Sequence, residues 1–101
     1  MKKNLDKIHH LAIPVKDINR ALDWYEERFK FEIEYRDQSW ALLQFQNMKI
    51  AFVLSEEHPA HIAFETDHVE FYGMPKLHRD GTRSTYITDS EDNTVEFFNV
   101  E

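Results

Sequence analysis

Two histidines open two similar stretches of this 101-residue chain, and their type and spacing suggest metal chemistry. His10-Leu-Ala-Ile recurs 51 residues later as His61-Ile-Ala-Phe, an offset of about half the chain. A near-repeat of this kind predicts two copies of one small unit, with equivalent residues meeting at a shared site. Because imidazole is a common ligand of divalent transition metals, a site with two histidines could hold such an ion.

Strand alternation puts both histidines on the same side of the expected sheet. Side chains along a strand point alternately to its two faces. Leu11, Ile13 and Val15 form an apolar face that should lie under a helix, so His10 should face the other way. The same reasoning applies to His61 in the second copy. An alanine two residues after each histidine leaves room on that face.

A carboxylate in the last strand could complete the ligand set. Glu96 lies between two apolar residues, and it projects toward the histidine side if those residues pack under helices. Two imidazoles and one carboxylate suit Fe(II), Mn(II), Ni(II) or Zn(II) and leave positions for two oxygens of a substrate. The sequence therefore predicts His10, His61 and Glu96 as metal ligands. His9 ranks well below His10, because its alternation points it to the helix side.

Composition excludes several classes of protein. The formal charge of −7 argues against nucleic acid or an anionic membrane as a partner. The absence of cysteine excludes disulfides, thiolate nucleophiles and thiolate metal sites. No apolar run approaches a membrane span and the polar start is no signal peptide, so we expect a cytoplasmic protein. A chain this short is expected to be one domain over residues 1–101, with one module at about 5–55 and another at about 60–101.

Hydrophobic periodicity predicts the elements that position these residues. A helix is expected over 18–29, after Asp17 as its N-cap. A second, short helix is expected over 68–72, and a loop over 76–81. The acidic run 89–93 should be a hairpin turn, because it lacks the glycine and the spacing of a calcium loop. Strands are expected at 8–15, 31–36, 40–45, 49–54, 61–66, 83–88 and 94–100.

The order of these features resembles the vicinal oxygen chelate superfamily, which holds glyoxalases, bleomycin-resistance proteins, fosfomycin-resistance enzymes and extradiol dioxygenases. The resemblance rests on a histidine strand, a helix with the aromatic pair Trp24-Tyr25, a second histidine strand, and an acidic turn followed by Glu96. It implies an α+β fold in which two βαβββ modules form a cupped, barrel-like mixed sheet, often completed across a homodimer.

The resemblance also assigns roles to residues. The family's first histidine, second histidine and last-strand glutamate match the three ligands predicted above. The fourth ligand of glyoxalase-type members, a glutamate or glutamine, falls on Ala51, so the base that those members use for proton abstraction is missing. Ser84 and Tyr86 match a serine and a tyrosine that line the substrate pocket of fosfomycin-resistance proteins. The helix that ends with Leu-Gly-Phe in the family has Lys30 at the glycine position, which requires a left-handed residue or a different helix end.

Two functions from different classes follow from this comparison. The first is a metal-dependent enzyme, such as a lyase, thiol transferase or dioxygenase, that chelates a small oxygen-rich molecule through vicinal oxygens. The second is a metal-free, drug-sequestering protein of the bleomycin-resistance type, in which Trp40 and Tyr86 stack on the ligand; Ala51 favours this alternative. A third possibility is a partner-binding dimer without catalysis. In each case we expect a homodimer, and in the first two a small-molecule ligand.

Overall fold

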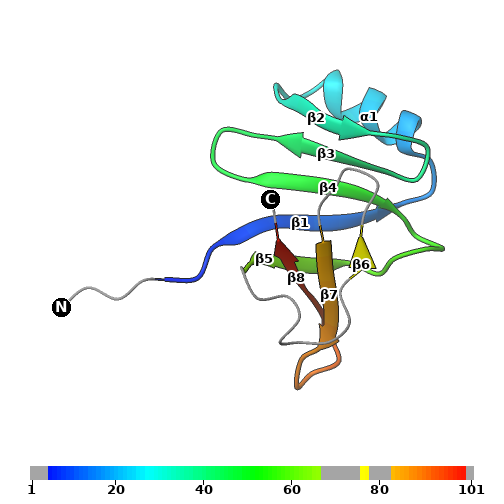
Figure 1. Cartoon of the computed structure of the whole chain (residues 1–101). Coiled ribbons are helices and arrows are strands. Elements are labelled where there is room, and N and C mark those ends of the chain that lie inside the picture. Colours follow the sequence, from blue (N-terminus) through cyan, green and yellow to red (C-terminus); the bar gives the residue numbers. More distant parts are fainter. Residues whose placement is uncertain (1–4, 67–75, 78–82, 100–101) are drawn as a thin grey trace. The chain divides into compact units, whose positions relative to one another are not determined.

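The chain forms two compact units. The computed structural model describes residues 5–66, 76–77 and 83–99 (Figure 1). One unit is continuous and runs from His10 to His61; we call it the His10–His61 unit. The other combines residues 1–9 with residues 62–101; we call it the terminal unit. Strands β1 and β5 cross the two boundaries between these units, so each strand contributes to both.

The His10–His61 unit has the element order βαβββ. Its neighbouring strands follow the order β2-β3-β4-β1. Strands β2, β3 and β4 pair antiparallel, whereas β1 pairs parallel with β4 and places Ala12 opposite Ala51. The bounds are β1 Ile8–Val15, α1 Ile18–Glu26, β2 Glu32–Arg36, β3 Trp40–Gln44 and β4 Lys49–Leu54.

Helix α1 begins where the sequence predicts. The side chain of the N-cap Asp17 accepts a hydrogen bond of 2.9 Å from the backbone N–H of Arg20, which satisfies one of the exposed amides of the first turn. Ile18 and Leu22 lie one turn apart and are both buried. The apolar stripe of this helix therefore faces its sheet, as its 3.6-residue period indicates.

The helix ends three residues earlier than predicted. The regular helix stops at Glu26, although the backbone N–H of Phe29 still donates to the carbonyl of Tyr25 at 2.8 Å. The Arg28 side chain donates to the carbonyl of Trp24 at 2.9 Å, so it satisfies one of the terminal carbonyls. No left-handed residue is used here: among the described non-glycine residues, only Asp92 has a positive φ. Of the two alternatives offered by the sequence, a left-handed Lys30 or a different helix end, the structure has the different helix end.

The two faces of this sheet carry different apolar clusters. Ile13 and Val15 of β1 pack with Ile18 and Leu22 of the helix, and Phe52 of β4 completes that core. The opposite face holds a second, smaller cluster, made of Ala12, Leu42, Ala51 and Val53 with Tyr35 and Trp40 packed against it. The predicted alternation along β1 is confirmed for Ile13 and Val15, which pack on the helix side, and for Ala12, which lies on the other face.

The terminal unit contains the other four strands, in the order β5-β8-β7-β6. The predicted loop over 76–81 is wrong at its start, because Lys76 and Leu77 pair with Ser84 and Arg83 as a short strand. A strand of two residues is too short to show an alternating pattern. The predicted helix over 68–72 lies outside the described residues. The bounds are β5 His61–Glu65, β6 Lys76–Leu77, β7 Arg83–Thr88 and β8 Thr94–Asn99.

The acidic run between β7 and β8 is a hairpin turn, as predicted. Asp89 organises it: its carboxylate accepts hydrogen bonds from the backbone N–H groups of Glu91, at 2.8 Å, and Asn93, at 2.9 Å. These bonds, that of Asn93 foremost, hold the pKa of Asp89 below its usual value. Asp92 has φ 67°, the left-handed conformation that aspartate tolerates better than most residues.

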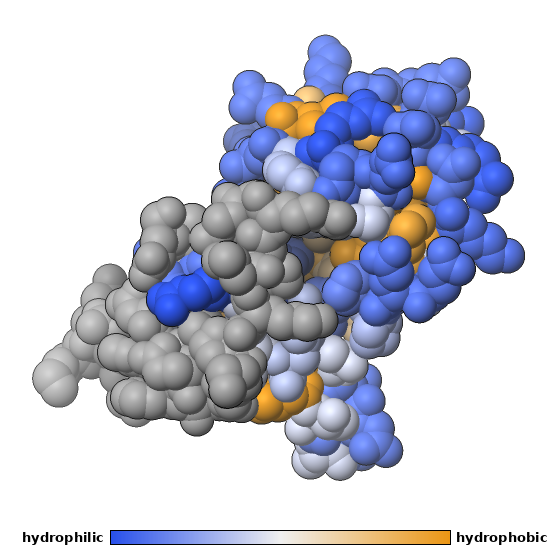
Figure 2. Space-filling model, turned by 45° about the vertical axis from the view of Figure 1, so that its right-hand side comes forward, coloured by the Kyte–Doolittle hydropathy of each residue, from blue (hydrophilic) through white to orange (hydrophobic). Residues whose placement is uncertain are grey.

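These elements have the α+β class and the βαβββ module predicted from the sequence. In the view of Figure 2 hydrophilic side chains predominate, and hydrophobic ones form separate, smaller patches. Within the described part of the chain, no helix is long and apolar enough to cross a bilayer. The assignment of residues 1–101 to a single domain stays a prediction.

Candidate functional site

The His10–His61 unit brings the two predicted histidine ligands together. The centroids of the His10 and His61 rings are 6.0 Å apart, and the rings meet edge to face at 69°. Only 3% of His10 and 7% of His61 is exposed. Because His10 lies in β1 and His61 begins β5, this pairing joins two residues at opposite ends of the unit. The repeat in the sequence therefore marks two residues that meet in space.

A hydrogen bond of the His61 ring shows which of its two nitrogens carries the hydrogen. Its Nδ1 lies 2.8 Å from the carbonyl oxygen of Pro59. A carbonyl can only accept, so Nδ1 carries the hydrogen, and in the neutral ring Nε2 then carries the lone pair. Metal-binding histidines are commonly oriented by a hydrogen bond of this kind from the second ring nitrogen. His61 therefore has the geometry of a histidine that presents Nε2 to an ion.

Glu96 is the predicted carboxylate ligand and belongs to the terminal unit. It is 2% exposed, although glutamate is rarely buried unless it is paired. In the register of β7 and β8, Glu96 lies opposite Tyr86 and next to the pair formed by Ser84 and Phe98. Burial raises the pKa of Tyr86, and the negative charge of Glu96 raises it further.

Hydrogen bonds connect Ser84, Tyr86 and Glu96 within this unit. A hydrogen bond between Tyr86 and Glu96 also raises the tyrosine pKa, as expected when the phenol donates to the carboxylate. A hydrogen bond from Ser84 acts in the opposite direction, as expected when a hydroxyl donates to the phenol oxygen. Ser84 is fully buried. The two residues predicted to line a substrate pocket thus lie beside the predicted carboxylate ligand.

His9, the weaker candidate ligand, makes a different contact. Its ring stacks on that of Phe98 in the terminal unit, with centroids 4.4 Å apart and an angle of 28°. The side chain is 7% exposed. The aromatic contact gives His9 a packing role, while His10, its neighbour in β1, belongs with His61.

Trp40 is supported by two residues that the sequence analysis missed. Its ring packs on that of Tyr35 in a tilted arrangement, with centroids 4.6 Å apart, and the hydroxyl of Tyr35 donates to the Asp37 carboxylate at 2.6 Å. That carboxylate also accepts from the backbone N–H groups of Ser39 and Trp40, at 2.8 and 3.0 Å. The sequence predicted a turn at Asp37-Gln-Ser but not this network. The signal that could have indicated it is the tyrosine two residues before the aspartate.

Ala51, at the position of the family's fourth ligand, is 1% exposed within the smaller apolar cluster. It lies opposite Ala12 of β1 and Leu42 of β3. A methyl group offers no donor atom. On this face of the sheet the chain therefore supplies apolar surface at the position where the resemblance implied a fourth ligand.

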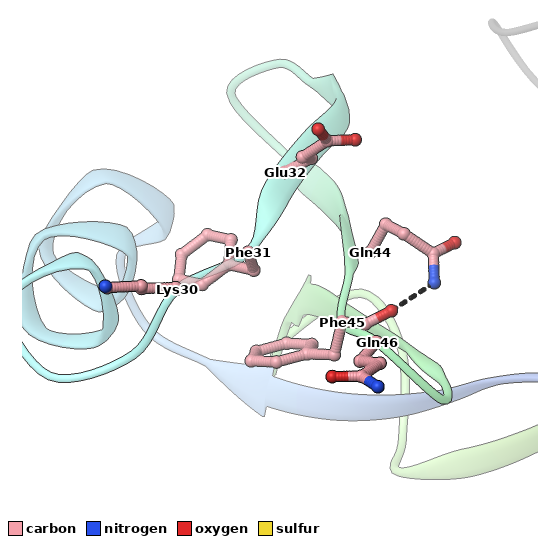
Figure 3. Close-up of a pocket in the computed structure, with 6 residues that line it drawn as sticks. All are labelled: Lys30, Phe31, Glu32, Gln44, Phe45 and Gln46. Atoms are coloured by element: carbon pink, nitrogen blue, oxygen red, sulfur yellow. Dashed lines mark hydrogen bonds between the residues drawn. The ribbon is translucent and has the colours of Figure 1, made fainter.

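A cavity of about 430 Å³ lies elsewhere in the His10–His61 unit (Figure 3). The rings of Phe31 and Phe45 line it with centroids 5.2 Å apart, and in Figure 3 the Gln44 amide donates to the carbonyl of Phe45. Lys30, Glu32 and Gln46 complete the lining. It contains none of the residues predicted from the sequence to bind a metal or a substrate.

Comparison with known proteins gives a consistent family relationship. A sequence model described as "Glyoxalase/Bleomycin resistance protein/Dioxygenase superfamily" matches residues 7–97. No curated protein matches the sequence significantly.

Solved structures are similar in fold at low identity. A hypothetical protein from Bacillus halodurans C-125 has a TM-score of 0.74 at 19% identity, covering 97% of this chain and 96% of that one. Streptomyces coelicolor methylmalonyl-CoA epimerase, in complex with 2-nitronate-propionyl-CoA, has a TM-score of 0.77 at 18% identity, with coverages of 95% and 98%. A glyoxalase/bleomycin resistance protein/dioxygenase superfamily member from Vibrio splendidus 12B01 has a TM-score of 0.67 at 11% identity, with coverages of 94% and 98%.

Proposed function

Because the chain belongs to the glyoxalase/bleomycin resistance protein/dioxygenase superfamily, we propose that it is a metal-dependent enzyme acting on a small oxygen-rich molecule. The proposed ligands are His10, His61 and Glu96, each of which offers one donor atom to an ion. The observation that carries this proposal is the buried pair of histidines, one of which is oriented by a backbone carbonyl. A divalent cation bound by these residues would act as a Lewis acid on two neighbouring oxygens of a substrate.

The donor set suits a borderline metal. Imidazole nitrogens and one carboxylate are typical ligands of Fe(II), Mn(II), Ni(II) and Zn(II), and three protein ligands leave positions for a substrate. Burial of all three side chains keeps them from bulk water, which strengthens electrostatic interactions at the site. Trp40 would contact an apolar or planar part of the substrate.

The first test of this proposal is metal binding. Tag-free protein should bind close to one equivalent of Ni(II) or Mn(II) per chain, measured by calorimetry and by elemental analysis after dialysis. His61→Ala should weaken binding by more than about 100-fold, because a direct ligand should matter at least as much as the second-shell partners that change affinity by about 10- to 100-fold. His58→Ala is the matched control, since His58 lies three residues before His61, outside β5, and is not a proposed ligand.

The outcomes of this test are distinct. Uptake that is lost in His61→Ala and kept in His58→Ala supports the enzyme. Wild-type protein without metal, or a His61→Ala variant that binds as tightly as wild type, excludes the proposed site. If metal binds, a panel of an epoxide with a thiol, a catechol with oxygen, and a coenzyme A thioester would separate the reaction classes. Proton abstraction is the least favoured class, because Ala51 cannot act as a base.

A second function is favoured by the apolar face around Ala51. In this alternative the protein binds a planar or hydrophobic molecule without a metal, and Trp40 stacks on it. The packing of Trp40 on Tyr35, beside the cluster that contains Ala51 and Ala12, supports this possibility. Quenching of tryptophan fluorescence by a bleomycin-type drug, lost in Trp40→Phe and kept in Trp24→Phe, would support it. Absence of quenching in metal-free protein would exclude it.

We also propose that the protein is a homodimer, because a domain of this size buries a limited share of its surface. Light scattering after size-exclusion chromatography tests this directly. A mass of one chain, 12.2 kDa, across the accessible concentration range would exclude the dimer.

A further inference from the structure

We propose that Tyr86 is a positioning residue for the Glu96 carboxylate, holding it through the hydrogen bond that the phenol donates, and that Ser84 in turn holds Tyr86. This inference rests on the proposed function, because it concerns a proposed metal ligand. It goes beyond that function by giving Tyr86 and Ser84 a role toward the metal instead of direct contact with a substrate.

The strand register places these three residues side by side. Tyr86 of β7 is directly opposite Glu96 of β8, and Ser84 lies two residues before Tyr86 on the same face. Opposite residues of an antiparallel pair have their Cβ atoms about 4.5–5.5 Å apart. A tyrosine side chain can therefore reach the carboxylate across the ladder with no change of backbone. The turn at 89–93 fixes the register, because Asp89 accepts hydrogen bonds from both Glu91 and Asn93.

Burial makes the orientation of this carboxylate important. Glu96 is 2% exposed and Ser84 is fully buried, so the environment of the carboxylate is set by protein groups. A carboxylate has about four lone-pair positions. A phenol that occupies one of them leaves others for an ion and restricts rotation of the group. The result is a carboxylate held in one orientation before a metal arrives.

The direction of the hydrogen bonds supports this role. Tyr86 has one hydroxyl hydrogen, and because an ionised carboxylate can only accept, that hydrogen lies in the bond to Glu96. The phenol oxygen then accepts from Ser84, whose hydroxyl can rotate to donate. The chain Ser84 to Tyr86 to Glu96 thus runs in one direction and ends on the proposed ligand. Partners of this kind typically change metal affinity by about 10- to 100-fold when they are removed.

The test is the Ni(II) affinity of tag-free Tyr86→Phe, measured by calorimetry. We expect binding at least about 10-fold weaker than in wild type, because the carboxylate loses the group that orients it. Tyr35→Phe is the matched control. It also removes a phenol that donates to a carboxylate, that of Asp37, but one that is not a proposed ligand. Its Ni(II) affinity should equal that of wild type.

A double-mutant cycle separates positioning from a general structural effect. In a Glu96→Gln background, Tyr86→Phe should leave Ni(II) affinity unchanged, because its influence acts through the carboxylate. Equal losses in both backgrounds would overturn the inference. Ser84→Ala is a second variant, and its expected loss of Ni(II) affinity is smaller than that of Tyr86→Phe. It replaces Tyr86→Phe in the test if circular dichroism shows that Tyr86→Phe does not fold.

The failure of this inference differs from the failure of the proposed function. If wild-type protein binds Ni(II) and both Tyr86→Phe and Ser84→Ala bind it equally well or more tightly, only the positioning role is wrong. If wild-type protein binds no Ni(II), both the metal site and the role of Tyr86 are excluded.

Discussion

Replacing Ala51 by glutamate should return a fourth ligand to the protein, at a measurable cost in the absence of metal. Ala51 is 1% exposed and lies among Ala12, Leu42 and Val53. A larger side chain in a packed cluster costs about 1–3 kcal/mol of stability. A buried polar group without a full set of partners costs about 1–3 kcal/mol more. The metal-free variant should therefore lose about 2–6 kcal/mol, a large part of the roughly 5–15 kcal/mol typical of a domain.

Ala51→Leu is the matched control for size. Leucine also crowds the cluster, but it adds no polar group, so its loss should be only the overpacking cost of about 1–3 kcal/mol. The difference between the variants in metal-free buffer then reports the burial of the carboxyl group. For a chain of this length, each 1 kcal/mol shifts the midpoint of thermal unfolding by about 4–8 °C. Melting curves followed by circular dichroism in the presence of a chelator resolve such differences.

Added Ni(II) should narrow the difference in stability between the two variants. If the new carboxylate coordinates the ion, a tenfold tighter affinity adds about 1.4 kcal/mol of stability at a fixed excess of metal. Ala51→Glu should thus gain more from Ni(II) than wild type, and Ala51→Leu should not. The reasoning is refuted if Ni(II) raises the midpoint of Ala51→Glu no more than that of wild type, because the new carboxylate then lies away from the ion.

Two further predictions concern the turns that contain Asp37 and Asp92. The hydrogen bonds of Asp37 outweigh the effect of burial and keep the pKa of its carboxyl below its usual value of 3.8. Its stabilising contribution is thus present above about pH 4 and lost as the pH falls through the lower, folded-state pKa. Urea unfolding of Asp37→Asn should show a deficit against wild type at pH 6 that shrinks by pH 3; a constant deficit would contradict this. Asp92→Val should lose about 1 kcal/mol or more, because a branched residue disfavours a φ of 67°, whereas Asp92→Gly should be at least as stable as wild type in the same assay.

The elements of the His10–His61 unit could be predicted from the sequence because each has a strong local signal. Local sequence was sufficient for the apolar stripe of the helix, for its aspartate cap and for the alternation of β1, because each depends only on residues close together in the chain. The helix end was missed because Phe29 keeps the helical period: its ring still contacts Tyr25, at 5.7 Å, although the regular helix has ended. Periodicity reports which side chains pack together, and such packing extends past the last regular turn.

Contacts across strands were harder to predict than the strands themselves. The resemblance to a family gave Tyr86 and Ser84 a place in a substrate pocket, but not their hydrogen bonds with Glu96. That relation depends on the register of β7 and β8, which the turn fixes. The support of Trp40 by Tyr35 and Asp37 depends in the same way on a hairpin register, which single residues do not reveal.

The two ends of the His10–His61 unit meet at the histidine pair, and this has a consequence for protein engineering. A segment whose first and last side chains are in contact can be replaced as one piece, because both of its ends lie close together. Residues 10–61 of a relative could be exchanged for these with only two junctions, both at the histidines. Circular permutants with new termini in the turn around Asn47 would leave the chain intact at both His10 and His61. Such chimaeras would show which of the two units determines a difference in metal or ligand binding between the parent proteins.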